Sequence, residues 1–144
     1  MTEPGVDITC AVSPPEPIGE DALKSVLQDI LIDRRATAIL TCILTDDTAL
    51  RQLNREFRGT DAPTDVLSFD LSDPVHPAGA TTGEIYISLE QARQQARETH
   101  RPFHEVVTHL AVHGVLHLLG FEHDTDVGHI RMQQQEAHYL ARLK

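Results

Sequence analysis

The sequence predicts a single α+β domain, with a mixed sheet of about four strands packed against about five helices. The chain is 144 residues long and 40% apolar, which suits one compact domain over residues 1–144. Short alternating apolar stretches indicate strands, and longer stretches with a 3.6-residue period indicate helices. One helical stretch near the C-terminus is apolar almost all round and carries histidines, which predicts a central buried helix.

The first half of the chain predicts a strand, a helix and a second strand in that order. Residues 6–12 alternate as a strand does, and a proline-rich turn separates them from a helix expected over 20–34. Residues 36–44 form a second and more apolar strand. We therefore expect these two strands to pair in parallel through a right-handed crossover.

Two further strands and four helices complete the predicted order. Asp46 or Asp47 can cap the helix that follows the second strand, and Gly59 can end it. Strands are expected over 64–69 and 83–88, and the two can pair as neighbours. The last three helices are expected over 89–100, from Pro102 to Gly120, and over 127–143.

Charge and composition exclude several classes of protein. Twelve Lys and Arg residues against twenty-two Asp and Glu give a net charge of -10, which argues against a protein that coats nucleic acid non-specifically. Arginines do recur on one side of two predicted helices, at positions 51, 55 and 58 and at positions 93, 97 and 101. No apolar run approaches the ~18 residues of a membrane span, and no signal peptide is evident, so we expect a cytoplasmic protein. Two cysteines make neither a disulfide framework nor a thiolate metal cluster.

The most informative motif is a set of three histidines, His113, His117 and His123. The first two are four residues apart on the apolar helix, which places both imidazoles on one face and within reach of one ion. Gly120 can then turn the chain back toward that ion and bring His123 with it. Three nitrogen ligands with an open fourth position are typical of a catalytic zinc site.

Hydrogen-bonded histidines near a core are the alternative interpretation of this motif. A lone histidine would favour it, but three histidines at this spacing favour a metal, since an unpartnered imidazole in an apolar helix costs roughly 1 to 3 kcal/mol. His109 lies about 12 Å from His117 along the helix axis, too far to share an ion. We expect it to be an ordinary hydrogen-bonded histidine, with the orientation of a metal ligand as its other possible role.

The spacing also fits a zinc-protease pattern, with one departure. Gly114 stands where those proteases have a glutamate that acts as general base, so proteolysis is disfavoured. A metal can still lower the pKa of a water ligand toward ~7. A phosphodiester substrate would need a cation beside the metal, and Arg58 is the candidate because its planar guanidinium pairs with phosphate oxygens.

Four segments together resemble the bacterial YbeY family of metal-dependent endoribonucleases. They are residues 54–59, 64–69, 83–88 and 113–123, the last two reading Gly-Glu-Ile-Tyr-Ile-Ser and His-Gly-Val-Leu-His-Leu-Leu-Gly-Phe-Glu-His. The resemblance implies an endoribonuclease that cuts single-stranded RNA, matures the 3′ end of small-subunit ribosomal RNA and takes part in ribosome assembly and quality control. It also implies partners on the small ribosomal subunit, including ribosome-associated proteins, and neither DNA nor a membrane.

The resemblance also assigns site residues. The zinc ligands of the family fall on His113, His117 and His123, and its functional arginine falls on Arg58. We therefore expect one Zn²⁺ per chain, with Arg58 and His113 as the catalytic residues. Glu122 stands where the family commonly has aspartate. The substitution keeps the negative charge on a longer side chain. Two other readings stay open: a ribosome-assembly factor whose metal is structural, and a metallohydrolase with a different class of substrate.

Overall fold

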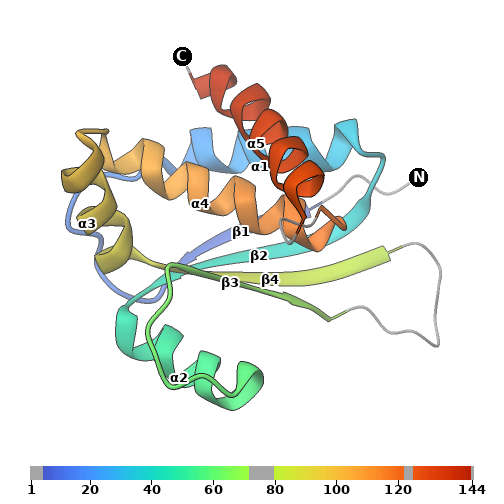
Figure 1. The fold of residues 1–144 in the computed structure, drawn as a ribbon. Coiled ribbons are helices and arrows are strands. Elements are labelled where there is room, and N and C mark those ends of the chain that lie inside the picture. Colours follow the sequence, from blue (N-terminus) through green and yellow to red (C-terminus); the bar gives the residue numbers. More distant parts are fainter. Residues whose placement is uncertain (1–4, 72–79, 122–124, 144) are drawn as a thin grey trace.

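The helices and strands follow one another in the order that the sequence predicts (Figure 1). The structure is a computed structural model, and it describes residues 5–71, 80–121 and 125–143. Within them the elements are β1 (Gly5–Cys10), α1 (Glu20–Asp33), β2 (Thr37–Thr45), α2 (Asp47–Arg58), β3 (Val66–Asp70), β4 (Ala80–Ser88), α3 (Leu89–Thr99), α4 (Phe103–Leu118), α5 (Asp126–Leu140) and a 3-10 turn (Ala141–Leu143).

The sheet is mixed, with the strand order β1-β2-β4-β3. β1 pairs with β2 in parallel, as the strand, helix and strand pattern predicts, and β2 pairs with β4 in parallel. β3 and β4 are neighbours, as expected, and run antiparallel. β3 therefore forms one edge of the sheet, with Ser68 opposite Ile85.

The helices lie unequally on the two faces of the sheet. In Figure 1, α1, α4 and α5 lie on one face and α2 lies on the other. The apolar core fills the first of these spaces, where α4 contributes ten buried residues. The prediction of a central buried helix is therefore confirmed, and so is the α+β fold class.

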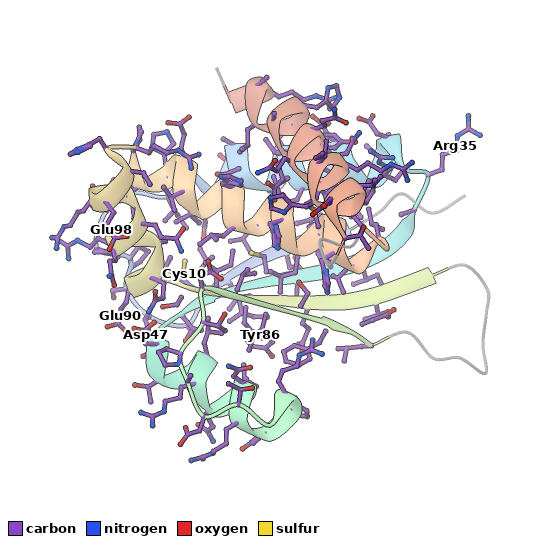
Figure 2. All side chains as sticks on the ribbon, viewed as in Figure 1. Cys10, Arg35, Asp47, Tyr86, Glu90 and Glu98 are labelled. Atoms are coloured by element: carbon purple, nitrogen blue, oxygen red, sulfur yellow. The ribbon has the colours of Figure 1, made fainter. Side chains whose placement is uncertain are left out.

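Local signals set the bounds of α2. The Asp46 side chain accepts a hydrogen bond from the Ala49 amide at 2.9 Å, and Gly59 ends the helix in the left-handed conformation at φ 71°. The next residue, Asp47, accepts a 2.6 Å hydrogen bond from the Ser88 hydroxyl. Its own amide donates to Glu90 at 2.9 Å, so the start of α2 is tied to the start of α3 (Figure 2).

Several details differ from the sequence prediction or complete it. α4 ends at Leu118, two residues earlier than expected, and the last helix ends at Leu140 before the 3-10 turn. His100 caps α3 in the left-handed conformation, so Arg101 lies beyond the helix that carries Arg93 and Arg97. Cys10 and Cys42 are both free thiols. None of the helices described here has the length and apolarity needed to cross a membrane.

Candidate functional site

Two of the predicted metal ligands lie one turn apart on α4. His113 and His117 line the same pocket of about 190 Å³, which Arg58, Val66, Leu67 and Ser68 complete. The two histidines belong to the narrow polar side of a helix whose other positions are mostly buried. His117 is exposed and the His113 side chain is 29% exposed, so both imidazoles are accessible from the pocket.

Arg58 reaches the same pocket from the other face of the sheet. It is the last residue of α2, and its guanidinium donates a hydrogen bond to the Ser68 carbonyl oxygen at 2.9 Å. The guanidinium also lies over the Phe69 ring, 5.3 Å from its centroid. The structure thus brings together Arg58, His113 and His117 at the β3 edge, from elements that are far apart in the sequence.

Gly114 lets α4 approach the sheet closely beside the two histidines. A Cβ at this position would lie 2.9 Å from Ile85 Cγ2 and 3.0 Å from the Ser68 hydroxyl. That hydroxyl donates a hydrogen bond to the Gly114 carbonyl oxygen at 3.0 Å. Position 114 therefore faces the sheet, and the glutamate of the zinc-protease pattern would have no space there.

Sequence reasoning missed one residue of this site, Glu136 of α5. It is a glutamate only 8% exposed, and its carboxylate accepts hydrogen bonds from His113 Nδ1 at 2.7 Å and from His109 Nε2 at 3.2 Å. A signal was present, because Met132, Glu136 and Tyr139 are spaced as one helix face and all three are buried. A glutamate on an apolar stripe needs a partner.

The pKa values of this pair reflect the contact. Burial acts to raise the pKa of Glu136, but the hydrogen bonds from His109 and His113 together outweigh it and lower that pKa to about 2. The hydrogen bond to Glu136 raises the pKa of His113, more than burial lowers it. Glu136 is therefore an ionised carboxylate at neutral pH.

His109 is a hydrogen-bonded histidine, as expected. Its Nδ1 lies 3.1 Å from a guanidinium nitrogen of Arg101, and its Nε2 contacts Glu136. Because Glu136 also contacts His113, the structure connects His109 to a predicted ligand through one shared carboxylate. The alternative role, in which His109 helps to orient a metal ligand, is thus compatible with its position.

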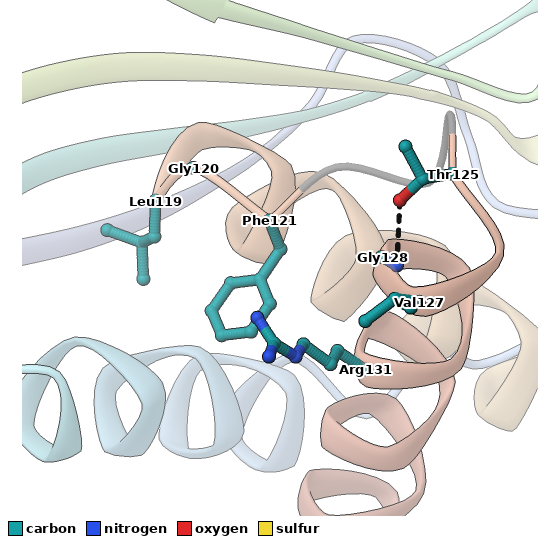
Figure 3. A pocket seen from close by; sticks show the side chains of 7 residues that line it. All are labelled: Leu119, Gly120, Phe121, Thr125, Val127, Gly128 and Arg131. Carbon is teal, nitrogen blue, oxygen red and sulfur yellow. Dashed lines mark hydrogen bonds between the residues drawn. The ribbon is translucent and has the colours of Figure 1, made fainter.

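The third predicted ligand, His123, and its neighbour Glu122 lie outside the described residues. Gly120 adopts φ 98°, a conformation that favours glycine, so the turn expected at this residue is present although α4 ends two residues before it. The turn borders a second pocket, of about 360 Å³, which Phe121 and Arg131 help to line and where the Gly128 amide donates to the Thr125 hydroxyl (Figure 3). Within the described ranges no three histidine, cysteine or acidic side chains gather as a metal site, so the zinc site itself stays a prediction.

Comparisons with known proteins agree with the sequence motifs. The family model described as "Endoribonuclease YbeY" matches residues 14–144. Proteins named Endoribonuclease YbeY include one from Rhodopseudomonas palustris, 46% identical over 74% of this chain and 57% of its own length. Another, from Chelativorans, is 35% identical over 99% of this chain and 92% of its own length.

A solved structure shows the same arrangement of elements. The solution structure of TM1509 from Thermotoga maritima aligns with a TM-score of 0.64 and 28% sequence identity. The alignment covers 96% of this chain and 88% of the Thermotoga chain. Since the family model spans nearly the whole chain and the Chelativorans relative aligns over nearly its whole length, this chain belongs to the YbeY family of endoribonucleases.

Proposed function

We propose that this chain is a zinc-dependent endoribonuclease that cuts single-stranded RNA and matures the 3′ end of small-subunit ribosomal RNA. The names of its relatives support RNA cleavage as the reaction. Its expected partners are the small ribosomal subunit and the proteins associated with it, in the cytoplasm. The finer assignments to zinc and to ribosomal RNA follow from the resemblance of the motifs.

One observation carries the proposal. A guanidinium and two imidazoles, contributed from the two faces of the sheet, line a single pocket at the edge strand β3. An edge site is open to an extended strand of RNA, whereas a closed cavity would admit only a small molecule. The arginine supplies the positive charge that a phosphodiester needs, in a chain whose net charge is -10.

His113, His117 and His123 would hold the zinc ion. The donor set fits this metal, because neutral imidazole nitrogens are ordinary zinc ligands and the Nδ1 atom of His113 is already held by a carboxylate. When bound, zinc supplies Lewis-acid polarisation and lowers the pKa of water at the site.

Arg58 is placed to bind the phosphate that is being cut. A guanidinium has five N–H donors, and the contact with the Ser68 carbonyl engages one of them while fixing the orientation of the group. The others can donate to non-bridging phosphate oxygens, where negative charge grows in the transition state. The Phe69 ring beneath the guanidinium limits its movement further.

Cleavage of a labelled RNA that spans the 3′ end of precursor small-subunit ribosomal RNA tests the proposal. We expect Arg58→Ala to cut about 10² to 10³ times more slowly, the usual cost of removing one charge-stabilising donor. His117→Ala should lose both zinc and cleavage, because two ligands hold an open site poorly. Arg93→Ala is the matched control, since Arg93 is an exposed arginine on α3 and should leave the rate unchanged.

Identical purification of the four proteins separates their own activity from contamination. A trace ribonuclease would cut equally in every preparation. Equal cutting by wild type and both site variants, or no cutting by any, would contradict the proposal. It would favour instead an assembly factor whose metal is structural.

A further inference from the structure

A network of hydrogen bonds links His113 to a second histidine, a glutamate and an arginine. It joins Arg101, which follows α3, to His109 on α4, then to Glu136 on α5 and back to His113 on α4. The four residues line a pocket of about 230 Å³. Of these four, only His113 also lines the pocket that contains Arg58, so Glu136 contacts His113 from a pocket that Arg58 does not line.

With Glu136 ionised and both imidazoles neutral, the contacts assign the proton of each histidine to one nitrogen. An ionised carboxylate only accepts hydrogen bonds, so His113 must donate from Nδ1 and His109 must donate from Nε2. The arginine guanidinium only donates, so Nδ1 of His109 must accept. The three N–H groups in these contacts then each meet an acceptor.

This proton arrangement has a consequence for metal binding. With its proton on Nδ1, His113 presents an unprotonated Nε2, and a metal ligand must be unprotonated. The opposite tautomer would place a proton on Nε2. A carboxylate that holds the Nδ1 proton also fixes the ring plane and makes the imidazole a stronger base.

We propose that Glu136 is a positioning residue that sets the tautomer and ring orientation of His113 for metal binding, and that His109 and Arg101 hold Glu136 in place. This inference rests on the assignment of His113 as a zinc ligand under the proposed function. It adds Glu136 and Arg101, which the histidine motif does not contain, and assigns His109 a role in holding Glu136 in place. Glu136 acts through His113, and it is not among the described residues that line the pocket that contains Arg58.

The zinc affinity of the full chain tests the proposal directly. Zinc-free wild type and Glu136→Gln are titrated with Zn²⁺ in competition with a chelator, with no RNA present. The glutamine oxygen can accept a hydrogen bond from one histidine, but its amide group faces the other. We expect zinc to bind about 10 to 100 times more weakly, the usual effect of losing a partner behind a ligand.

A matched control and a graded variant sharpen the test. Glu98→Gln makes the same chemical change at an exposed position on α3 and should bind zinc as wild type does. Arg101→Met removes the donor to His109 and keeps the contact between Glu136 and His113. We expect it to weaken zinc binding by less than Glu136→Gln does.

A measurement on wild type alone keeps the proposal open to contradiction even if Glu136→Gln does not fold. In the ¹⁵N spectrum of the zinc-free protein, recorded at an alkaline pH where His113 is neutral despite its raised pKa, His113 should show a protonated Nδ1 and an unprotonated Nε2. A proton on Nε2 would overturn the proposal, as would a folded Glu136→Gln with wild-type affinity.

The same titration separates this proposal from the assignment on which it rests. If His117→Ala binds zinc as tightly as wild type does, the metal site itself is wrong and this proposal falls with it. If His117→Ala loses zinc while Glu136→Gln keeps it, the metal site stands and only the role of Glu136 is wrong.

Discussion

The face of the sheet that α1, α4 and α5 cover is fully buried at its centre, whereas the face toward α2 is only partly covered. On the first face Ile85 is 0% exposed. On the second, Ile39 is 59% exposed and Phe57 of α2 is 63% exposed. A row of aromatic edge contacts joins Phe57 to Phe69 at 5.4 Å and Phe69 to Tyr86 at 5.8 Å, with Tyr86 on the α2 side of the sheet (Figure 2).

This difference in burial suggests that one face of the sheet stabilises the fold and that the other is available to bind a partner. Burial of apolar surface concentrates on the face under α4, and that is where substitutions should unfold the protein. The α2 face carries an exposed aromatic ring and arginines near its edge, which stabilise little and remain open to a partner. The candidate site lies at β3, where His113 and His117 from one face meet Arg58 from the other.

Substituting one isoleucine on each face of the sheet should give the largest difference in the free energy of unfolding. Ile85→Ala removes a buried side chain against α4 and should lower the free energy of unfolding by about 2 to 5 kcal/mol. Ile39→Ala makes the same change on the exposed face and should lower it by less than about 1 kcal/mol. Urea denaturation followed by circular dichroism measures both.

The isoleucine pair is its own control because the removed atoms are identical. A loss at Ile39 equal to that at Ile85 would mean that the α2 face is buried in the folded protein, against the comparison. A change in the slope of the urea transition would show that a substitution alters the unfolded state. In that case the urea midpoints are compared only between variants with equal slopes.

Local signals explain why most of the fold was predictable. Asp46 caps the start of α2 and Gly59 ends it, so both ends of this helix could be predicted from single residues. The apolar pattern alone identified α4 as buried. The face of the sheet that α2 covers was not predictable, because an apolar stripe shows that a helix packs but not where. Glu136 was missed for a related reason: it pairs with His113 across 23 residues of sequence, and only the packing of α5 on α4 brings them together.

Some residues of the site could be predicted from the sequence and others could not, because only some of the contacts lie within one helix. The spacing of His113 and His117 is a property of one helix, so sequence reasoning could place them together. Arg58 was a candidate because a phosphodiester needs a cation beside the metal, and the resemblance assigned it to the site. The structure supports that placement with a shared pocket. His123 lies outside the described residues, so its place in the site stays a prediction.

The second test of the comparison is the contact between α4 and the sheet at Gly114. In Gly114→Ala the new methyl group must displace Ile85, at an overpacking cost of about 1 to 3 kcal/mol. Better helix propensity returns up to ~1 kcal/mol, so we expect a net loss of roughly 1 kcal/mol. The same urea denaturation measures it.

Combining the two substitutions on the buried face shows whether they share one space. In the double variant Gly114→Ala, Ile85→Ala, the new methyl group can occupy part of the cavity that Ile85 leaves. The combined loss should therefore be smaller than the sum of the single losses by at least about 0.5 kcal/mol. Simple additivity would show that the helix does not meet the sheet at this point.

Charge reversal on the exposed face should have the smallest effect, and on binding instead of folding. Arg55 is an exposed arginine of α2, one turn before Arg58. Arg55→Glu should weaken binding of single-stranded RNA by about 10-fold at low salt, since it replaces attraction to a phosphate with repulsion. The slope of log K against log salt should fall by about 0.7, the value for one phosphate contact.

Glu20→Lys is the control, because Glu20 begins α1 among the acidic residues of the first quarter of the chain. If both reversals change RNA binding in proportion to net charge alone, the arginines of α2 form no local RNA surface and the two faces do not differ in recognition. If Arg55→Glu acts alone and unfolds in urea as wild type does, RNA recognition belongs to the face that contributes least to stability.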